Sequence, residues 1–171
     1  AIVNSSTASC FVSMADGANF IGASSMRGAV SEKPGEPLEI RELRLANLAS
    51  DDVIVRIQAT SLCHTDLEAV DGHLDTPLPF VPGHEAAGIV EWTGSSVYRL
   101  SVGDHVALSW NPHCGHCYFC SHEQFILCEQ YRANGVRSMH FDGKARIFDG
   151  KQPVHQLMYA GTFAELAVVT E

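Results

Sequence analysis

The sequence predicts a mainly β domain built as a partly open barrel. Three observations support this: many short apolar segments with strand-like spacing, few segments with a helical period, and long loops containing Pro and Gly. The 171 residues can bury a sizeable core, and 46% hydrophobic against 18% charged residues is typical of a globular protein. No G-x-G-x-x-G motif and no strand–helix alternation occurs, so we expect no Rossmann-type, cofactor-binding domain in this chain.

The expected strands are short and closely spaced. They cover residues 26–30, 38–45, 52–61, 86–92, 105–109 and 163–170. The first two flank a Lys-Pro-Gly turn at 33–35. Apolar and polar residues alternate over 52–61, which predicts a half-buried strand, and a short helix is expected to begin directly after it, at 62–66. Residues 71–85 are punctuated by Pro and Gly and are expected to form a loop.

The beginning of the chain differs in composition from the rest. Residues 1–25 are rich in Ser, Ala, Gly and Asn and lack the basic start and apolar run of a signal peptide. We interpret them as a flexible or added extension of a cytoplasmic protein whose folded domain covers 26–171. The net charge of −9 argues against nucleic acid or an anionic membrane as partner. No apolar run reaches the about 18 residues of a membrane helix.

Four of the six cysteines crowd into one short segment. Cys114, Cys117, Cys120 and Cys128 follow the spacing C-x2-C-x2-C-x7-C. Neighbours in such a run bridge each other poorly but wrap a metal ion readily. Four thiolates complete a tetrahedral Zn²⁺ shell and leave no open position. The spacing therefore predicts a structural zinc site in a lobe over 110–131.

Two other interpretations of the cysteines remain. Ferredoxin-like iron–sulfur sites also use C-x2-C-x2-C, but they usually continue with x3-C-P, whereas no proline follows Cys128. Free or disulfide-linked cysteines are the third interpretation. His113, His116 and His122 are expected to be solvated, because four thiolates would fill the metal shell. Cys10 lies in the extension and has no partner pattern.

Five segments follow one another in a specific order: SLCHTD, VPGHEAAGIV, VGDHV, the spaced cysteines and GTFAEL. CHTD and GHE are weak signals individually, since a lone Cys or His is usually a structural residue. Together, from about residue 26 to the end, they resemble the N-terminal GroES-like catalytic domain of zinc-dependent medium-chain alcohol dehydrogenases. The pattern is most similar to the glutathione-dependent formaldehyde and aryl-alcohol dehydrogenases. The resemblance implies a GroES-like barrel with short helices and a zinc lobe.

The resemblance implies a role for each matching residue near the metal. Cys63 and His84 match two ligands of a catalytic zinc, and Glu85 lies beside the metal and can approach it during ligand exchange. Thr65 matches the hydroxyl that receives the substrate proton. Asp66 matches a carboxylate that accepts a hydrogen bond from the ligand His84 and fixes its orientation.

Four further positions are implied at the edge of the site. His64 matches a position that faces the cofactor pyrophosphate. Leu74 and Trp110 fall where the family lines its substrate pocket, with plain core packing as the alternative. Glu68 stands where much of the family has a His that completes a proton relay, so the relay would run differently or through water.

The implied activity is oxidation of a primary alcohol, or reduction of an aldehyde, with hydride transfer to or from NAD or NADP. Zinc acts as a Lewis acid on the substrate oxygen. The third protein ligand and the cofactor domain are expected beyond residue 171. We therefore expect a truncated chain that binds structural zinc, holds catalytic zinc poorly and turns over no alcohol, and a full-length protein that is a homo-oligomer.

Two other classes of protein compete with the dehydrogenase interpretation. One is a non-catalytic, zinc-stabilised interaction module that reuses the fold, because fold alone does not fix function. The other is a relative of the co-chaperonins, which follows from the barrel alone. The co-chaperonin interpretation gives no reason for CHTD, GHE or the cysteine lobe.

Overall fold

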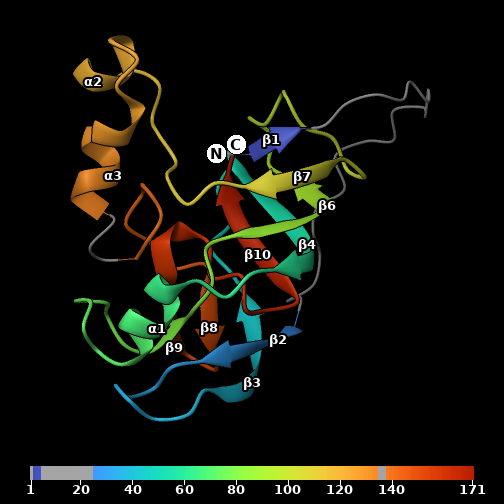
Figure 1. Ribbon diagram of the computed structural model, residues 1–171. Helices are drawn as coiled ribbons and strands as arrows, with labels where there is room; N and C mark the ends of the chain where they lie inside the picture. The colour runs from blue at the N-terminus through green and yellow to red at the C-terminus, as the bar shows by residue number, and fades with distance from the viewer. Residues whose placement is uncertain (1, 5–24, 135–137) are drawn as a thin grey trace.

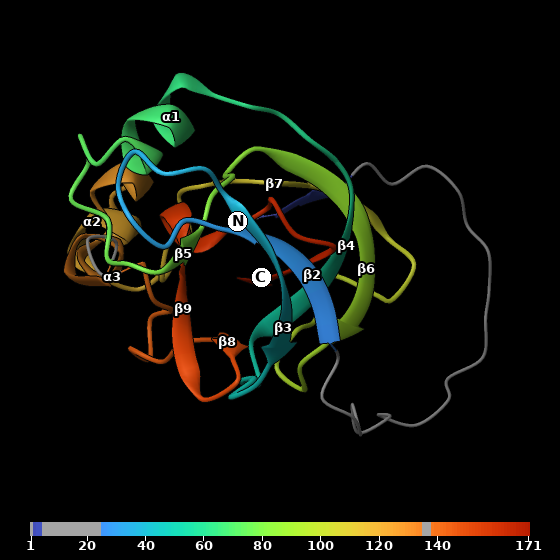
Figure 2. The same cartoon turned by 90° about the horizontal axis from the view of Figure 1, so that it is seen from below.

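The computed structural model describes residues 2–4, 25–134 and 138–171 (Figure 1). Within this part, the backbone forms two five-stranded sheets. Their strands curl around a shared interior, as the view in Figure 2 shows. The mainly β, partly open barrel predicted from the sequence is therefore confirmed.

The first sheet has the strand order β1-β7-β6-β4-β10 and is antiparallel throughout. Its strands are β1 (Ile2–Asn4), β4 (Asp52–Thr60), β6 (Ala86–Thr93), β7 (His105–Leu108) and β10 (Leu166–Thr170). The second sheet has the order β2-β3-β8-β9-β5. Its strands are β2 (Ser25–Val30), β3 (Glu39–Leu45), β5 (Phe80–Val81), β8 (Ile147–Asp149) and β9 (Gln152–Gln156). An isolated bridge pairs Gly28 of β2 with Ala164, which lies just before β10.

Strand β4 lies inside the first sheet and separates two hydrophobic clusters. Ile54 packs in one cluster, and Val53 and Val55 pack in the other. The expected half-buried alternation is wrong for the beginning of the strand, because residues 52–55 are all buried. The alternating pattern fails there because both faces of the strand are covered. The end of β4 emerges towards solvent and leads directly into α1 (His64–Val70), close to where a helix was expected.

The structure contains several short elements that were not predicted from the sequence. Strand β5 interrupts the expected loop and pairs in parallel with β9, far along the chain. The cysteine lobe contains three short helical pieces: α2 (Tyr118–Ser121), η1 (Phe125–Leu127) and α3 (Glu129–Asn134). A further helical turn, η3 (Leu157–Tyr159), precedes the last strand. Elements this short carry too few residues to show a period.

The beginning of the chain differs from the predicted boundaries at two places. Ile2–Asn4 forms β1 and pairs with β7, although composition assigned these residues to an extension. Strand β2 begins at Ser25, one residue before the predicted start of the folded domain. The remainder of the expected extension, including Cys10, lies outside the described residues. None of the described helices is long and apolar enough to cross a membrane.

Candidate metal centres

The four lobe cysteines converge on one point. All four Sγ atoms lie within 4.8 Å of one another. The Cys117 and Cys120 sulfurs are 3.5 Å apart, and those of Cys114 and Cys120 are 3.9 Å apart. Tetrahedral zinc with Zn–S bonds of about 2.3 Å would place neighbouring sulfurs about 3.8 Å apart. The donor set and spacing therefore fit Zn²⁺, and the cysteines of the described chain form no disulfide.

Short local elements bring these sulfurs together. Cys117 precedes α2, Cys120 lies within it, and Cys128 joins η1 to α3. Gly115 turns the chain with a φ of +77°, which favours glycine. The backbone N–H of Cys114 donates to the Cys128 sulfur at 3.3 Å. The whole cluster is built within one contiguous segment.

The sulfurs of Cys117 and Cys120 lie in different electrostatic environments. Hydrogen bonds from the backbone N–H groups of Glu129 and Cys120 lower the pKa of the Cys117 thiol to about 6. Burial raises the pKa of Cys120. A thiolate is the form that ligates metal, so Cys117 already favours a cation at neutral pH.

The histidines of the lobe make other contacts. The His113 ring lies 4.4 Å from the Phe125 ring. Nδ1 of His116 donates to the Cys114 carbonyl at 2.7 Å, and Nδ1 of His122 donates to the Tyr118 carbonyl at 2.8 Å. Among the described residues, none of the three belongs to a group of possible metal ligands.

A second group of possible ligands comprises Cys63, His84 and Glu85. Their ligand atoms also lie within 4.8 Å of one another. Cys63 stands at the start of α1, after β4, whereas His84 and Glu85 lie between β5 and β6. His84 is buried, Cys63 is half-buried and Glu85 is exposed. Strands of both sheets are thus needed to bring these side chains together.

One buried carboxylate ties the two segments of this group together. Asp66 accepts hydrogen bonds from the backbone N–H groups of Cys63 at 2.9 Å and Gly83 at 2.8 Å. Its Oδ1 also lies 3.1 Å from Nδ1 of His84. Because a carboxylate accepts, Nδ1 carries the hydrogen, and the lone pair of Nε2 is left for a metal. The structure thus places the Asp66 carboxylate against the ring of the candidate ligand His84.

Gly83 fixes the position of the chain just before His84. Its φ is +90°, and an added Cβ would lie 2.3 Å from Thr162 Oγ1 and 2.5 Å from the Phe163 ring. The carbonyl of Gly83 accepts from the N–H of Thr162 at 3.0 Å. The Thr162 hydroxyl lies 2.8 Å from that of Thr60, at the end of β4. The role of Thr162 as a support was missed, and its only sequence signal is its place in GTFAEL.

The remaining polar residues gather around α1. Thr65 Oγ1 lies 3.7 Å from the Cys63 sulfur. The carboxylate of Glu68 faces two largely exposed imidazoles, with Oε1 3.1 Å from His64 Nε2 and Oε2 3.7 Å from His73 Nδ1. The structure thus brings Thr65 to the candidate ligands and pairs Glu68 with His64.

Comparison with known proteins identifies the family of the chain. The family model described as "Alcohol dehydrogenase GroES-like domain" matches residues 49–171, which is most of the chain. The chain belongs to this family. It is an alcohol dehydrogenase GroES-like domain, and the resemblance stated from the sequence is confirmed.

Curated relatives of this alcohol dehydrogenase domain span plants and bacteria. "Alcohol dehydrogenase 1" of Pisum sativum is 39% identical over 145 residues, which cover 84% of this chain and 38% of the relative. "S-(hydroxymethyl)glutathione dehydrogenase" of Photobacterium damsela subsp. piscicida is 38% identical over 148 residues, which cover 85% and 40%. The chain therefore spans about two fifths of the length of these relatives.

Solved structures show the same relationship. The "alcohol dehydrogenase zinc-binding domain protein" of Burkholderia ambifaria matches with a TM-score of 0.81 and 36% identity, covering 88% of this chain and 41% of that one. Benzyl alcohol dehydrogenase of Acinetobacter calcoaceticus matches with a TM-score of 0.77 and 31% identity, covering 86% and 39%.

Leu74 and Trp110, the two residues expected to line a substrate pocket, have different neighbours in the structure. Leu74 lines a small hollow beside Pro34 and His73. The Trp110 ring meets the Tyr131 ring edge-on, with centroids 6.1 Å apart. Both side chains are partly exposed. Their roles in substrate binding stay predictions.

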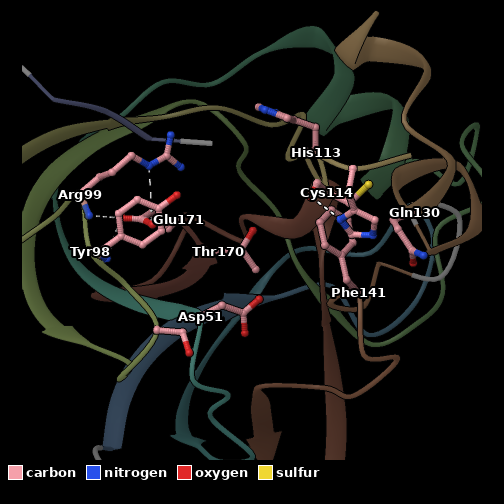
Figure 3. A pocket seen from close by; sticks show the side chains of 12 residues that line it. Asp51, Tyr98, Arg99, His113, Cys114, Gln130, Phe141, Thr170 and Glu171 are labelled. Atoms are coloured by element: carbon pink, nitrogen blue, oxygen red, sulfur yellow. Dashed lines mark hydrogen bonds and ion pairs between the residues drawn. The ribbon is translucent and has the colours of Figure 1, made fainter. Parts of the chain in front are cut away.

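One hollow of the described domain lies away from Cys63 and His84. It has a volume of about 500 Å³ and lies between the end of β10, the β6–β7 loop and the cysteine lobe. Figure 3 shows Arg99 and Glu171 on one side and His113 and Cys114 on the other. Cys114 is the one candidate metal ligand among its lining residues, whereas Cys63, His84 and Glu85 lie outside the hollow.

Proposed function

We propose that this domain supplies the metal and substrate-oxygen site of a zinc-dependent alcohol dehydrogenase. The reaction would be oxidation of a primary alcohol, or reduction of an aldehyde, with NAD or NADP. The observation that carries the proposal is the junction of Cys63 and His84 through the buried Asp66 carboxylate. Two relatives support the substrate class, since their names refer to benzyl alcohol and to S-(hydroxymethyl)glutathione, which both carry a CH2OH group.

The donor chemistry of this group fits zinc. Cys63 offers sulfur, His84 offers the Nε2 nitrogen, and Glu85 offers a carboxylate oxygen from an exposed side chain. Zinc accepts all three donor types and keeps one position open in catalytic sites. With zinc and a nicotinamide bound, the metal would polarise the substrate oxygen and the nicotinamide would exchange hydride with the carbon.

The domain's own residues would position the substrate and move its proton. The Thr65 hydroxyl, next to Cys63, can accept the proton of the alcohol while passing its own outward. Asp66 keeps the His84 tautomer fixed through turnover. His64, exposed at the start of α1, is available to a cofactor phosphate, and its partner Glu68 is available to receive a proton near the surface.

The lobe cysteines are proposed to hold a structural zinc. Their four sulfurs fill a tetrahedral shell, so no position is left for a substrate. The two centres therefore have separate roles. Taken alone, the described chain is expected to hold zinc firmly in the lobe, weakly at Cys63 and His84, and to turn over no alcohol. The full-length protein is proposed to be a homo-oligomer.

The activity is tested on the full-length protein that carries this domain. We expect NAD- or NADP-dependent oxidation of a primary alcohol such as benzyl alcohol. Cys63→Ser should lower kcat/KM at least about 1000-fold, because removal of a ligand disrupts the Lewis acid. His122→Asn, an exposed lobe variant, should keep full activity. Equal activity of Cys63→Ser and the parent would contradict the proposal, and so would a properly folded, zinc-loaded protein that oxidises no alcohol.

A further inference from the structure

Gln156 is a buried polar side chain that links the two sheets of the barrel. It is the last residue of β9 and is 2% exposed. Its amide nitrogen, Nε2, donates to the carbonyls of Ala160 at 3.0 Å and Val168 at 2.9 Å. Val168 belongs to β10 of the first sheet, whereas β9 belongs to the second sheet. One side chain therefore holds an edge strand of the first sheet against the second.

Both polar atoms of this amide have partners. Oε1 of Gln156 lies 3.1 Å from Nε2 of His140, and Nε2 of Gln156 also lies 3.4 Å from the Tyr159 carbonyl. Because carbonyl oxygens only accept, the atom of the amide that faces them must be the NH2 group. Displacing a fully hydrogen-bonded amide would leave buried polar groups without partners, which is costly. Gln156 therefore favours one arrangement of the backbone around it.

The segment that follows Gln156 is a turn, residues 157–161, with an unusual backbone conformation. Met158 and Tyr159 have φ values of +49° and +61°, which residues other than glycine adopt rarely and at a cost. The Gln156 amide donates to two carbonyls of this turn. Gly161 packs directly on the Gln156 side chain, since a Cβ added to Gly161 would lie 3.1 Å from its Cγ. The contacts of Gln156 thus help to hold a turn that is unfavourable by itself.

The backbone that supports His84 comes directly after this turn. The N–H of Thr162, the next residue along the chain, donates to the carbonyl of Gly83 at 3.0 Å. The N–H of Gly83 donates to the Asp66 carboxylate at 2.8 Å, and the same carboxylate oxygen faces Nδ1 of His84. A displacement of the turn would therefore displace Gly83 and, with it, the ring of His84.

A second connection between Gln156 and His84 runs through the sheet. Gln156 pairs with Val81 in the parallel ladder of β9 and β5, and Val81 lies three residues before His84. The preceding residue of β9, His155, donates its N–H to the carbonyl of Pro79 at 2.9 Å. Gln156 therefore acts on the segment before His84 both from its own strand and, through the turn, from Thr162.

We propose that Gln156 is a positioning residue of the Cys63–His84 centre. The proposal rests on the zinc-binding function proposed above for that centre. Gln156 fixes the turn against β10, and the turn fixes Thr162 and then Gly83. The ligand atoms of His84 and Cys63 are thereby kept within 4.8 Å of each other. Gln156 acts through these residues rather than by contact with the metal.

The test replaces Gln156 by methionine, which has a similar shape but offers no N–H donor. Gln156→Met therefore removes the hydrogen bonds to the turn and to β10 while the space stays filled. The matched control is Leu100→Ala, which truncates a buried side chain in the cluster on the other side of β4. Urea unfolding measures how far each substitution lowers the global stability, so that local effects can be separated from a general loss of stability.

The first measurement is cobalt binding by the full chain after the lobe has been filled with zinc. A Co²⁺ ion bound to a cysteine sulfur gives a charge-transfer absorption band, and the band that Cys63→Ser abolishes belongs to the Cys63–His84 centre. We expect Gln156→Met to bind Co²⁺ there at least about tenfold more weakly than the parent, with a shifted band. Leu100→Ala should bind within about twofold of the parent. An unchanged affinity and spectrum in Gln156→Met would overturn the proposal.

The second measurement is hydrogen exchange of the same zinc-filled chain without cobalt. We expect Gln156→Met to lower the protection of the Thr162 and Gly83 amides at least about tenfold more than that of the Val90 amide, which donates to a carbonyl elsewhere in the barrel. Leu100→Ala should show no such excess. An equal loss at all three amides of Gln156→Met would overturn the proposal. A parent that binds no cobalt at Cys63 would contradict the proposed function, whereas the exchange pattern still decides whether Gln156 positions the segment before His84.

Discussion

The two candidate metal centres of this domain are built by opposite means. The lobe cysteines come from one short segment and are positioned by turns and helices of a few residues each. Cys63 and His84 come from separate segments and meet only because the barrel brings α1 next to the end of β5. The first group offers four cysteine sulfurs, and the second offers one sulfur, one imidazole and an exposed carboxylate.

This difference separates the tasks of the two sites. A locally built site with every position filled can stabilise its own segment but offers no place for a substrate. A site assembled across the barrel depends on the fold, on a supporting carboxylate and on close backbone packing. We therefore expect substitutions in the lobe to affect only the lobe. Substitutions that disturb the barrel should also disturb the arrangement of Cys63 and His84.

The largest effect is expected from Cys128→Ser, which removes a fully buried lobe ligand. Zinc affinity of the lobe should fall more than about 100-fold, because metal binding and folding of such a segment are coupled. Chelator competition measures the affinity, and hydrogen exchange should show lost protection over 110–134. His122→Asn is the matched control. Loss of protection throughout the barrel would show that the lobe is not an independent unit.

The next effect concerns the backbone before His84. Gly83→Ala should cost about 3 kcal/mol or more, since the new Cβ combines a positive φ with contact to Thr162 and Phe163. Gly103→Ala is the matched control: its φ is +96°, yet nothing lies within 4 Å of the added Cβ. It should cost only about 1 kcal/mol. Urea unfolding of the two variants gives the difference, and equal costs would refute the packing argument.

Asp66→Asn should act on one centre only. Loss of the carboxylate that faces His84 should weaken zinc binding at Cys63 and His84 about 10- to 100-fold, while affinity in the lobe is unchanged. Asp71→Asn, at the exposed end of α1, is the control and should bind as the parent does. An unchanged affinity in Asp66→Asn would mean that the carboxylate does not orient the ligand.

The smallest effect is expected for Glu85→Gln. This side chain is 51% exposed and lies 3.8 Å from the His84 Nε2 nitrogen. Its other oxygen accepts a hydrogen bond from the Ser61 hydroxyl, so it is already partly satisfied without metal. We expect less than a tenfold loss of zinc affinity at this centre. A loss as large as that of Cys63→Ser would make Glu85 a full ligand.

The predictability of each centre follows from how it is built. The cysteine spacing alone was enough to group the lobe ligands, because the segment is contiguous. Cys63, His84 and Asp66 needed a family resemblance, since no local pattern relates α1 to the end of β5. The support from Gly83 and Thr162 depends on the approach of two distant backbone segments, which composition and periodicity do not report.

Burial caused the main errors about the fold. The alternation over β4 predicts one covered face, but the strand lies between two clusters and is covered on both at its start. Strand β5 has two residues and exists through its pairing with β9. The polar side chains of Asp52, His140 and Arg146 would be expected at the surface, and only the tertiary structure reveals that they are buried together.

The most direct test of the central claim is zinc binding followed by native mass spectrometry, with the parent, Cys63→Ser and Cys128→Ser compared. We expect two zinc ions in the parent, one tight and one weak. Cys63→Ser should lose only the weak ion, and Cys128→Ser should lose the tight one. A single zinc ion whose affinity is unaffected by Cys63→Ser would contradict the account.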